Sequence, residues 1–221
     1  MIKLVIFDLD GTLLNTIGDI NHSLNDALQK VGLPEVSIEE CKYMVGSGTD
    51  LLIERVLKKL LGIQYNDEKA KYFDILKKNY LENYAKWKNV TTRPYQGIEE
   101  VIYQIRRMGI KTAVYTNKSD ENAQNVVLTA IGPGNFDFII GKRSDQKIKP
   151  WGLGIDIIKK ELGIDDGIIY VGDTNIDIET AKNAGIPIIA VTWGFRKASE
   201  LYEANYVIDN PEDIIAVIQY V

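Results

Sequence analysis

Hydrophobic and polar positions follow one period in the first part of the chain and another in the rest. From Ile17 to Trp87, apolar residues recur at spacings of three and four, which predicts a series of helices with one apolar stripe each. From Gly97 onward, short apolar runs alternate with amphipathic segments. Strands joined through single helices pair in parallel, and the helices then cover both faces of the sheet. We therefore expect an α/β fold with a doubly wound parallel sheet.

The same pattern gives the approximate extent of each element. Helices are expected near residues 17–31, from Ser37 to an interruption at Gly46–Thr49, from this interruption to about Leu61, and near 67–87, 98–108, 119–131, 153–162 and 176–184, near Ala198 and from Pro211. Strands are expected over 3–7, 110–116, 136–140, 168–171, 187–192 and 206–208. Ser37 and Glu40 form a capping-box pattern at the start of the second helix, and Thr49 or Ser47 is expected to cap the third.

The distance between the first two strands predicts an insertion. A parallel crossover needs about a dozen residues, usually one helix, whereas almost a hundred residues separate the opening strand from the strand at Ile110. We expect residues 15–92 to form a separate helical unit, and residues 1–14 with 93–221 to form the α/β core. The helical unit would be joined to the core by two connections, Leu14–Gly18 and Asn89–Gln96. These would lie side by side as hinges, so the helical unit is interpreted as a lid.

Composition narrows the possible functions. The chain has 221 residues, of which 45% are hydrophobic and 26% charged, as in ordinary globular proteins. A net charge of −5 leaves no basic excess for phosphate backbones, so nucleic-acid binding is not expected. One cysteine, Cys41, excludes an internal disulfide and suits a reducing compartment.

The location and the assembly can be stated only as expectations. No signal peptide and no apolar run of membrane-spanning length is visible. We therefore expect a cytoplasmic protein with no membrane partner, present as a monomer or a homodimer.

Polar residues follow the ends of the predicted strands. Asp8 and Asp10 come directly after the first apolar run, and Gly11 and Thr12 follow them. The other groups, at later strand or helix boundaries, are Thr116-Asn117, Lys149-Pro150 and Gly172-Asp173 with Asp177. The carboxyl ends of parallel strands share one edge of the sheet, where such folds bind ligands. We expect these side chains to meet there.

This set of residues contains the groups that phosphoryl transfer to a carboxylate requires. One aspartate attacks phosphorus, and a second protonates the leaving oxygen and later activates water. Carboxylate oxygens suit Mg²⁺, while a hydroxyl, backbone amides and a lysine can hold the remaining phosphate oxygens. Gly11 is expected to let the backbone approach the phosphate closely.

The motifs resemble those of the haloacid dehalogenase superfamily, specifically its phosphoglycolate-phosphatase-like branch, over nearly the whole chain. The first motif is matched by Asp8-Leu-Asp-Gly-Thr-Leu13, and the fourth by Val171-Gly-Asp-Thr-Asn-Ile-Asp-Ile178. The shorter second and third motifs correspond to Thr116-Asn-Lys118 and Lys149-Pro150. The resemblance implies a Rossmann-like core with an inserted α-helical cap domain.

The resemblance also implies a role for each matched position. Asp8 would be the nucleophile and a Mg²⁺ ligand, and Asp10 the general acid/base, binding the metal through its main-chain carbonyl. The remaining assignments are Asp173 as the other metal carboxylate, Thr116, Asn117 and Lys149 as phosphate-binding residues, and Asp177 as an outer partner, with Gly11 and Thr12 beside the site. Gly46, Ser47, Gly48 and Thr49 would select the substrate from the cap.

The expected activity is Mg²⁺-dependent hydrolysis of a small phosphorylated metabolite, with phosphoglycolate as the first candidate, through an aspartyl-phosphate. A phosphomutase or a pyrophosphatase on the same scaffold is the alternative. A dehalogenase is disfavoured, because Asp10 and the metal ligands serve phosphoryl chemistry. A non-catalytic receiver that accepts phosphate as a signal is also disfavoured, because Asp10 supplies an acid/base to the nucleophile.

Overall fold

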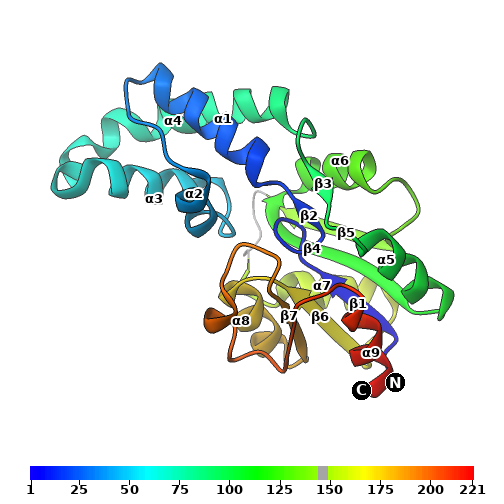
Figure 1. The fold of residues 1–221 in the computed structure, drawn as a ribbon. Helices are drawn as coiled ribbons and strands as arrows, with labels where there is room; N and C mark the ends of the chain where they lie inside the picture. Colours follow the sequence, from blue (N-terminus) through cyan, green and yellow to red (C-terminus); the bar gives the residue numbers. More distant parts are fainter. Residues whose placement is uncertain (144–148) are drawn as a thin grey trace. The chain divides into compact units, whose positions relative to one another are not determined.

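The computed structural model describes residues 1–143 and 149–221, and these residues form two compact units (Figure 1). The first, here named the core unit, contains Met1–Asn15 and Arg93–Val221. The second, here named the helical unit, contains Thr16–Thr92. The chain thus leaves the core unit once and returns to it once, and each unit is described by itself below.

The core unit is built on a six-stranded parallel sheet in the order β5-β4-β1-β6-β7-β8. The strands are β1 (Leu4–Phe7), β4 (Lys111–Ser119), β5 (Phe138–Lys142), β6 (Ile168–Gly172), β7 (Ile188–Val191) and β8 (Tyr206–Ile208). β1 is central: Phe7 lies opposite Val114 of β4 on one side and Val171 of β6 on the other. The predicted parallel α/β sheet is confirmed.

Helices cover both faces of this sheet (Figure 1). α5 (Ile98–Arg107), α6 (Asp120–Ala130) and α9 (Asp213–Tyr220) pack on the face that carries Val5 and Phe7. α7 (Leu153–Leu162) and α8 (Asn175–Ala184) pack on the opposite face, with Leu4 and Ile6. Successive strand residues point to opposite faces, and all four of these side chains are buried, so β1 reads as a continuous apolar run.

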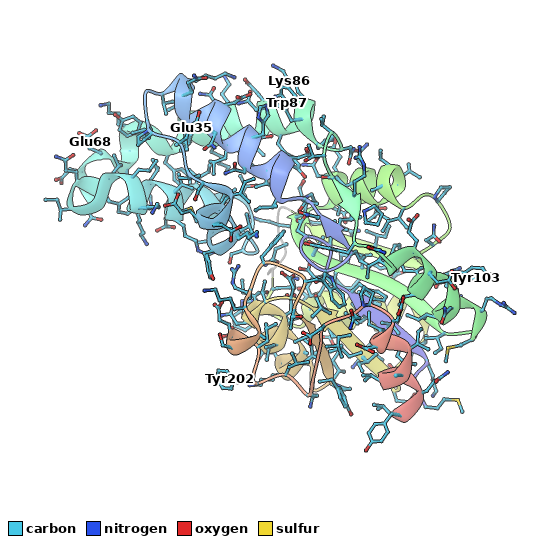
Figure 2. All side chains as sticks on the ribbon, viewed as in Figure 1. Glu35, Glu68, Lys86, Trp87, Tyr103 and Tyr202 are labelled. Atoms are coloured by element: carbon cyan, nitrogen blue, oxygen red, sulfur yellow. The ribbon has the colours of Figure 1, made fainter. Side chains whose placement is uncertain are left out.

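The outer surface of the core unit carries polar and aromatic side chains. Tyr103 on α5 and Tyr202, after the short helix η2 (Ala198–Glu200), are 54% and 76% exposed and point away from the core (Figure 2). Single exposed aromatic residues of this kind are normal on protein surfaces.

The helical unit contains α1 (Ile17–Lys30), α2 (Ile38–Met44), α3 (Thr49–Leu61), η1 (Gly62–Gln64) and α4 (Tyr65–Trp87). The Ser37–Glu40 capping box at the start of α2 is confirmed. The predicted cap of α3 is wrong: Gly48 occupies the N-cap position and no side chain caps the helix. The hydroxyl of Ser47 instead accepts a hydrogen bond from Arg55 at 2.8 Å, which braces the loop from within α3.

The two chain segments that run between the units contact each other within each unit. In the core unit, β2 (Leu14–Asn15) pairs antiparallel with β3 (Arg93–Pro94). In the helical unit, the buried carboxylate of Asp19 accepts four hydrogen bonds of 2.7–3.1 Å from the backbone and hydroxyl groups of Thr91 and Thr92. Burial opposes ionisation of Asp19, but these hydrogen bonds outweigh it and lower its pKa.

In residues 1–143 and 149–221, none of the helices has the length and apolar character needed to span a membrane.

Candidate active site

The two carboxylates of the first motif have different surroundings. Asp8 directly follows β1, its N–H donates to the carbonyl of Val171 at 2.8 Å, and its side chain is buried. Asp10 is partly exposed, and both of its carboxylate oxygens accept from Lys118 Nζ, at 2.8 and 2.9 Å. Asp8 therefore faces the interior of the site, whereas Asp10 has its own counter-ion.

Lys149 is the cation at the buried end of the site. Its ammonium lies 2.8 Å from Asp8 Oδ1 and 2.6 Å from Asp177 Oδ1, and the whole residue is 4% exposed. Its backbone is held on both sides by the Asn117 amide: Asn117 Nδ2 donates to the carbonyl of Lys149 at 3.3 Å, and Lys149 N–H donates to Asn117 Oδ1 at 2.8 Å. Asn117 thus aligns the segment that carries the lysine.

The carboxylates after β6 are also held in place. Asp173 Oδ1 accepts from the Thr12 hydroxyl at 3.0 Å, and Asp173 Oδ2 accepts from the Phe195 N–H at 2.7 Å. Asp177 Oδ2 accepts from both the hydroxyl and the N–H of Thr174, and the Asp177 N–H donates to the Thr174 hydroxyl oxygen, which completes a capping box at the start of α8. The Asp177 side chain therefore caps α8 and also belongs to the buried cluster of carboxylates.

Burial dominates the electrostatics of these groups. It raises the pKa of Asp8 to about 7, with Lys149 opposing the rise and the charges of Asp177 and Asp10 adding to it. Burial, with the charges of Asp177 and Asp8, raises the pKa of Asp173 well above its ordinary value. Burial would lower the pKa of Lys149, but Asp177 and Asp8 outweigh it, so the pKa of the ammonium is raised. The cluster is short of positive charge, and Lys149 stays protonated.

The donor set fits a divalent cation. Carboxylate oxygens of Asp8, Asp173 and Asp177 lie within 4.8 Å of one another, and all three side chains are buried. Asp8 Oδ1 contacts the Lys149 ammonium at 2.8 Å, and because a carboxylate oxygen has two lone pairs it can also bind a ligand. Asp177 accepts from the Lys149 ammonium at Oδ1 and from two Thr174 donors at Oδ2, whereas each oxygen of Asp173 accepts from one uncharged donor, so Asp8 and Asp173 are the better-placed ligands.

The backbone around Asp173 leaves room only for glycine. A Cβ atom on Gly11, whose φ is +91°, would lie 2.3 Å from Asp173 Oδ2, and one on Gly194 would lie 2.3 Å from Asp173 Cβ. We expect Gly11 to allow the backbone to approach a phosphate. The structure shows that this glycine makes room for the carboxylate of Asp173.

The core unit brings together the predicted residues of all four motifs. Thr116 lies beside the lysine that pairs with Asp10, and its hydroxyl accepts from the Lys118 N–H at 3.3 Å. The remaining predicted residues, Gly46–Thr49, belong to the helical unit, where the loop ends at α3.

Three contributors to the site were not singled out from the sequence. Lys118 stands in the second motif, but its charge alone gave no indication of its partner. Tyr170 sits in an apolar strand and reads as core; its hydroxyl accepts from Lys149 at 3.2 Å and donates to the Tyr115 carbonyl at 3.0 Å. Phe195 contributes only its backbone N–H, which leaves no side-chain signature.

Comparison with known proteins agrees with this arrangement. The sequence model of the haloacid dehalogenase-like hydrolases matches residues 5–191, which include every motif described above. The chain belongs to the haloacid dehalogenase-like hydrolase family. As a member of this family, it is 30% identical over 217 residues to the phosphoglycolate phosphatase of Aquifex aeolicus, with 98% of this chain and 96% of that protein covered.

Solved structures of similar proteins cover the whole fold of this haloacid dehalogenase-like hydrolase. One from Lactobacillus delbrueckii subsp. bulgaricus has 31% identity and a TM-score of 0.91, with 98% of both chains covered. The crystal structure of a predicted phosphoglycolate phosphatase from Haemophilus somnus 129PT has 26% identity and a TM-score of 0.89, with 98% of this chain and 97% of that chain covered.

Proposed function

We propose that this hydrolase is a Mg²⁺-dependent phosphatase that cleaves a small phosphomonoester through an aspartyl-phosphate on Asp8. The observation that carries the proposal is the pairing of two carboxylates with different counter-ions. Asp8 is buried beside Lys149 and other carboxylates, whereas Asp10 is partly exposed and pairs with Lys118. A nucleophile and a separate proton carrier need such different environments.

The first half-reaction transfers the phosphoryl group to the enzyme. A carboxylate oxygen of Asp8 attacks phosphorus, the bond from phosphorus to the leaving oxygen breaks, and Asp10 gives its proton to that oxygen. In the second half-reaction, water attacks phosphorus, its proton passes to Asp10, and Asp8 is released as a carboxylate. Thr116 and Lys149 are proposed to bind phosphate oxygens, which carry the charge in the transition state.

Mg²⁺ is the proposed metal, because it prefers carboxylate oxygens and usually needs only a few ligands from the protein. Asp8 and Asp173 would hold it, with the Asp10 carbonyl as a third protein ligand. When bound, the ion would offset the charge of the carboxylates and the phosphate so that they can approach each other. Asp177 is assigned to holding Lys149, since its Oδ1 accepts from the ammonium at 2.6 Å and its Oδ2 accepts twice from Thr174.

Phosphoglycolate is the first substrate candidate. Relatives that match nearly the whole length of this chain carry the name phosphoglycolate phosphatase. We propose that the helical unit acts as the cap and that Gly46, Ser47, Gly48 and Thr49 select the leaving group. The brace from Arg55 to Ser47 supports a defined loop conformation for this purpose. The cytoplasm is the proposed location, in keeping with the buried free thiol of Cys41.

A panel of phosphate donors tests the proposal. Phosphoglycolate, pyrophosphate, sugar phosphates and nucleotides are each incubated with the wild-type protein, with Mg²⁺ or with EDTA. We expect phosphate release from phosphoglycolate with Mg²⁺ only, and loss of that activity in Asp8→Asn.

Other outcomes identify other functions. Preference for pyrophosphate, or conversion of one sugar phosphate into its isomer, would replace the phosphatase by a pyrophosphatase or a phosphomutase. Incorporation of a single phosphoryl group without turnover would indicate a receiver. Full activity of Asp8→Asn would refute the mechanism itself.

A further inference from the structure

Among the described residues, Lys118 is the cation paired with Asp10, and the steps proposed above assign this lysine no role of its own. Its Nζ lies 2.8 Å from one carboxylate oxygen and 2.9 Å from the other, so the ammonium bridges both. The side chains are nearly enclosed, with 7% of Lys118 and 16% of Asp10 exposed. An ion pair this sheltered is screened much less than one at the surface, and it limits the rotation of a short carboxylate side chain.

The backbone that presents Lys118 has an irregular shape. β4 and β5 pair in register up to Tyr115 and Ile140, and again at Ser119 and Lys142, so four steps along β4 match two along β5. The extra residues form a bulge, and bulges turn side chains toward directions that a regular strand does not reach. The segment from residue 116 to residue 118 lies inside this bulge.

The neighbouring strand accommodates the bulge at one position. A Cβ atom on Gly141 would lie 2.6 Å from the Lys118 carbonyl and 2.7 Å from Asp120 Cα, so only glycine permits the approach. The Gly141 N–H also donates to Asp120 Oδ1 at 2.8 Å, which ties β5 to the start of α6 just past the bulge. The position of Lys118 is therefore built into the sheet.

We propose that Lys118 is a positioning residue that orients Asp10 toward the leaving oxygen and stabilises the carboxylate that remains after Asp10 has given up its proton. The inference rests on the proposed phosphatase mechanism and concerns only the step in which the leaving group departs. In that step the bond between phosphorus and the leaving oxygen breaks, the new bond to Asp8 forms, and the proton moves from Asp10 to the leaving oxygen. Lys118 transfers no proton.

The test compares leaving groups that need a proton with leaving groups that do not. Glycolate departs from phosphoglycolate as an alkoxide and needs the acid, whereas 4-nitrophenolate departs from 4-nitrophenyl phosphate as a stabilised anion. The ratio kcat/KM reports the steps up to departure of the leaving group. For Lys118→Met we expect kcat/KM for phosphoglycolate to fall by about 10- to 100-fold, and for 4-nitrophenyl phosphate by less than about threefold. Lys118→Arg should recover part of the loss, because it restores the cation.

A double variant shows whether Lys118 acts through Asp10. If it does, adding Lys118→Met to Asp10→Asn should change kcat/KM for phosphoglycolate by less than about twofold, because coupled residues are not additive. Lys111→Met, which removes a lysine from the exposed start of the same strand, is the matched control and should retain wild-type kinetics for both substrates.

Two results would overturn the inference while leaving the phosphatase intact. Equal losses for both substrates would mean that Lys118 binds phosphate or only supports the fold. A full further loss in the double variant would mean that it acts independently of Asp10. By contrast, a wild-type protein without phosphatase activity on either substrate would overturn the proposed function and the inference with it.

Discussion

Replacing Asp8 by asparagine should stabilise the metal-free protein while abolishing its activity. Burial raises the pKa of Asp8 from an ordinary 3.8 to about 7, so the folded state resists ionisation of this group more than the unfolded state does. A carboxyl group with a raised pKa in the folded protein lowers stability as the pH rises from the unfolded pKa to the folded one. The penalty is therefore absent at low pH and complete above about pH 7.

The size of the effect follows from the two pKa values. Each pH unit between them corresponds to about 1.36 kcal/mol, so the ionised group costs the fold about 4 kcal/mol at pH 8 and about 2 kcal/mol at pH 5. The substitution gives up the ionic contact of Asp8 Oδ1 with the Lys149 ammonium, and the pKa of about 7 already includes that contact. We expect Asp8→Asn to have a higher free energy of unfolding than the wild type by about 2–4 kcal/mol at pH 8, and by less than half of that at pH 5.

Urea unfolding in EDTA at the two pH values measures this difference, with Asp165→Asn as a control that removes an exposed carboxylate from the same unit. The control should stay within about 0.5 kcal/mol of the wild type at both pH values. Adding Mg²⁺ should stabilise the wild type and leave Asp8→Asn nearly unchanged, because the variant lacks a proposed ligand. An Asp8→Asn protein that is less stable than the wild type, or a difference independent of pH, would refute the reasoning.

Three further changes address other parts of the molecule. Asp19→Asn should destabilise the helical unit by about 2–4 kcal/mol, because it weakens four charge-assisted hydrogen bonds, whereas Asp26→Asn on the same helix should change stability by about 0.5 kcal/mol or less. As its pKa is lowered, the contribution of Asp19 should be present at neutral pH and be lost on acidification below about pH 4, which unfolding at several pH values would reveal. Gly194→Ala should displace Asp173 and remove the Mg²⁺-induced rise in unfolding temperature, and retention of that rise would contradict the close contact. Tyr170→Phe should lower kcat/KM about fivefold by removing a hydrogen bond of ~1 kcal/mol to the buried lysine, and unchanged kinetics would show that the hydroxyl is dispensable.

The sheet could be predicted because its strands are continuous apolar runs separated by single amphipathic helices. β1 is buried on both faces, so its sequence carries the signal by itself. The strands β2 and β3 could not be predicted, since two residues have no periodicity and their pairing depends on segments 78 residues apart in the chain. The missing cap of α3 shows a different limit: Ser47 could have capped the helix, but Arg55 binds its hydroxyl instead.

The site could be anticipated wherever a charged side chain directly follows a strand or lies in the segment before a helix. Asp8, Asp173 and Lys149 meet because the topology brings these boundaries to one region of the core unit. The partner of Asp10 could not be anticipated, because it depends on a bulge whose register involves the neighbouring strand. The backbone donor from Phe195 has no residue-type signature at all, so only the folded structure reveals it.

The most direct measurement is to trap the covalent intermediate. The wild-type protein is mixed with phosphoglycolate and Mg²⁺, quenched within a turnover, and treated with borohydride, which reduces an acyl phosphate to the corresponding alcohol. Peptide mass spectrometry should then find homoserine in place of Asp8 and nowhere else, with no such product in Asp10→Asn mixed with EDTA in place of Mg²⁺. Turnover of phosphoglycolate without modification of Asp8, or with modification of another aspartate, would contradict the assignment of Asp8 as the nucleophile.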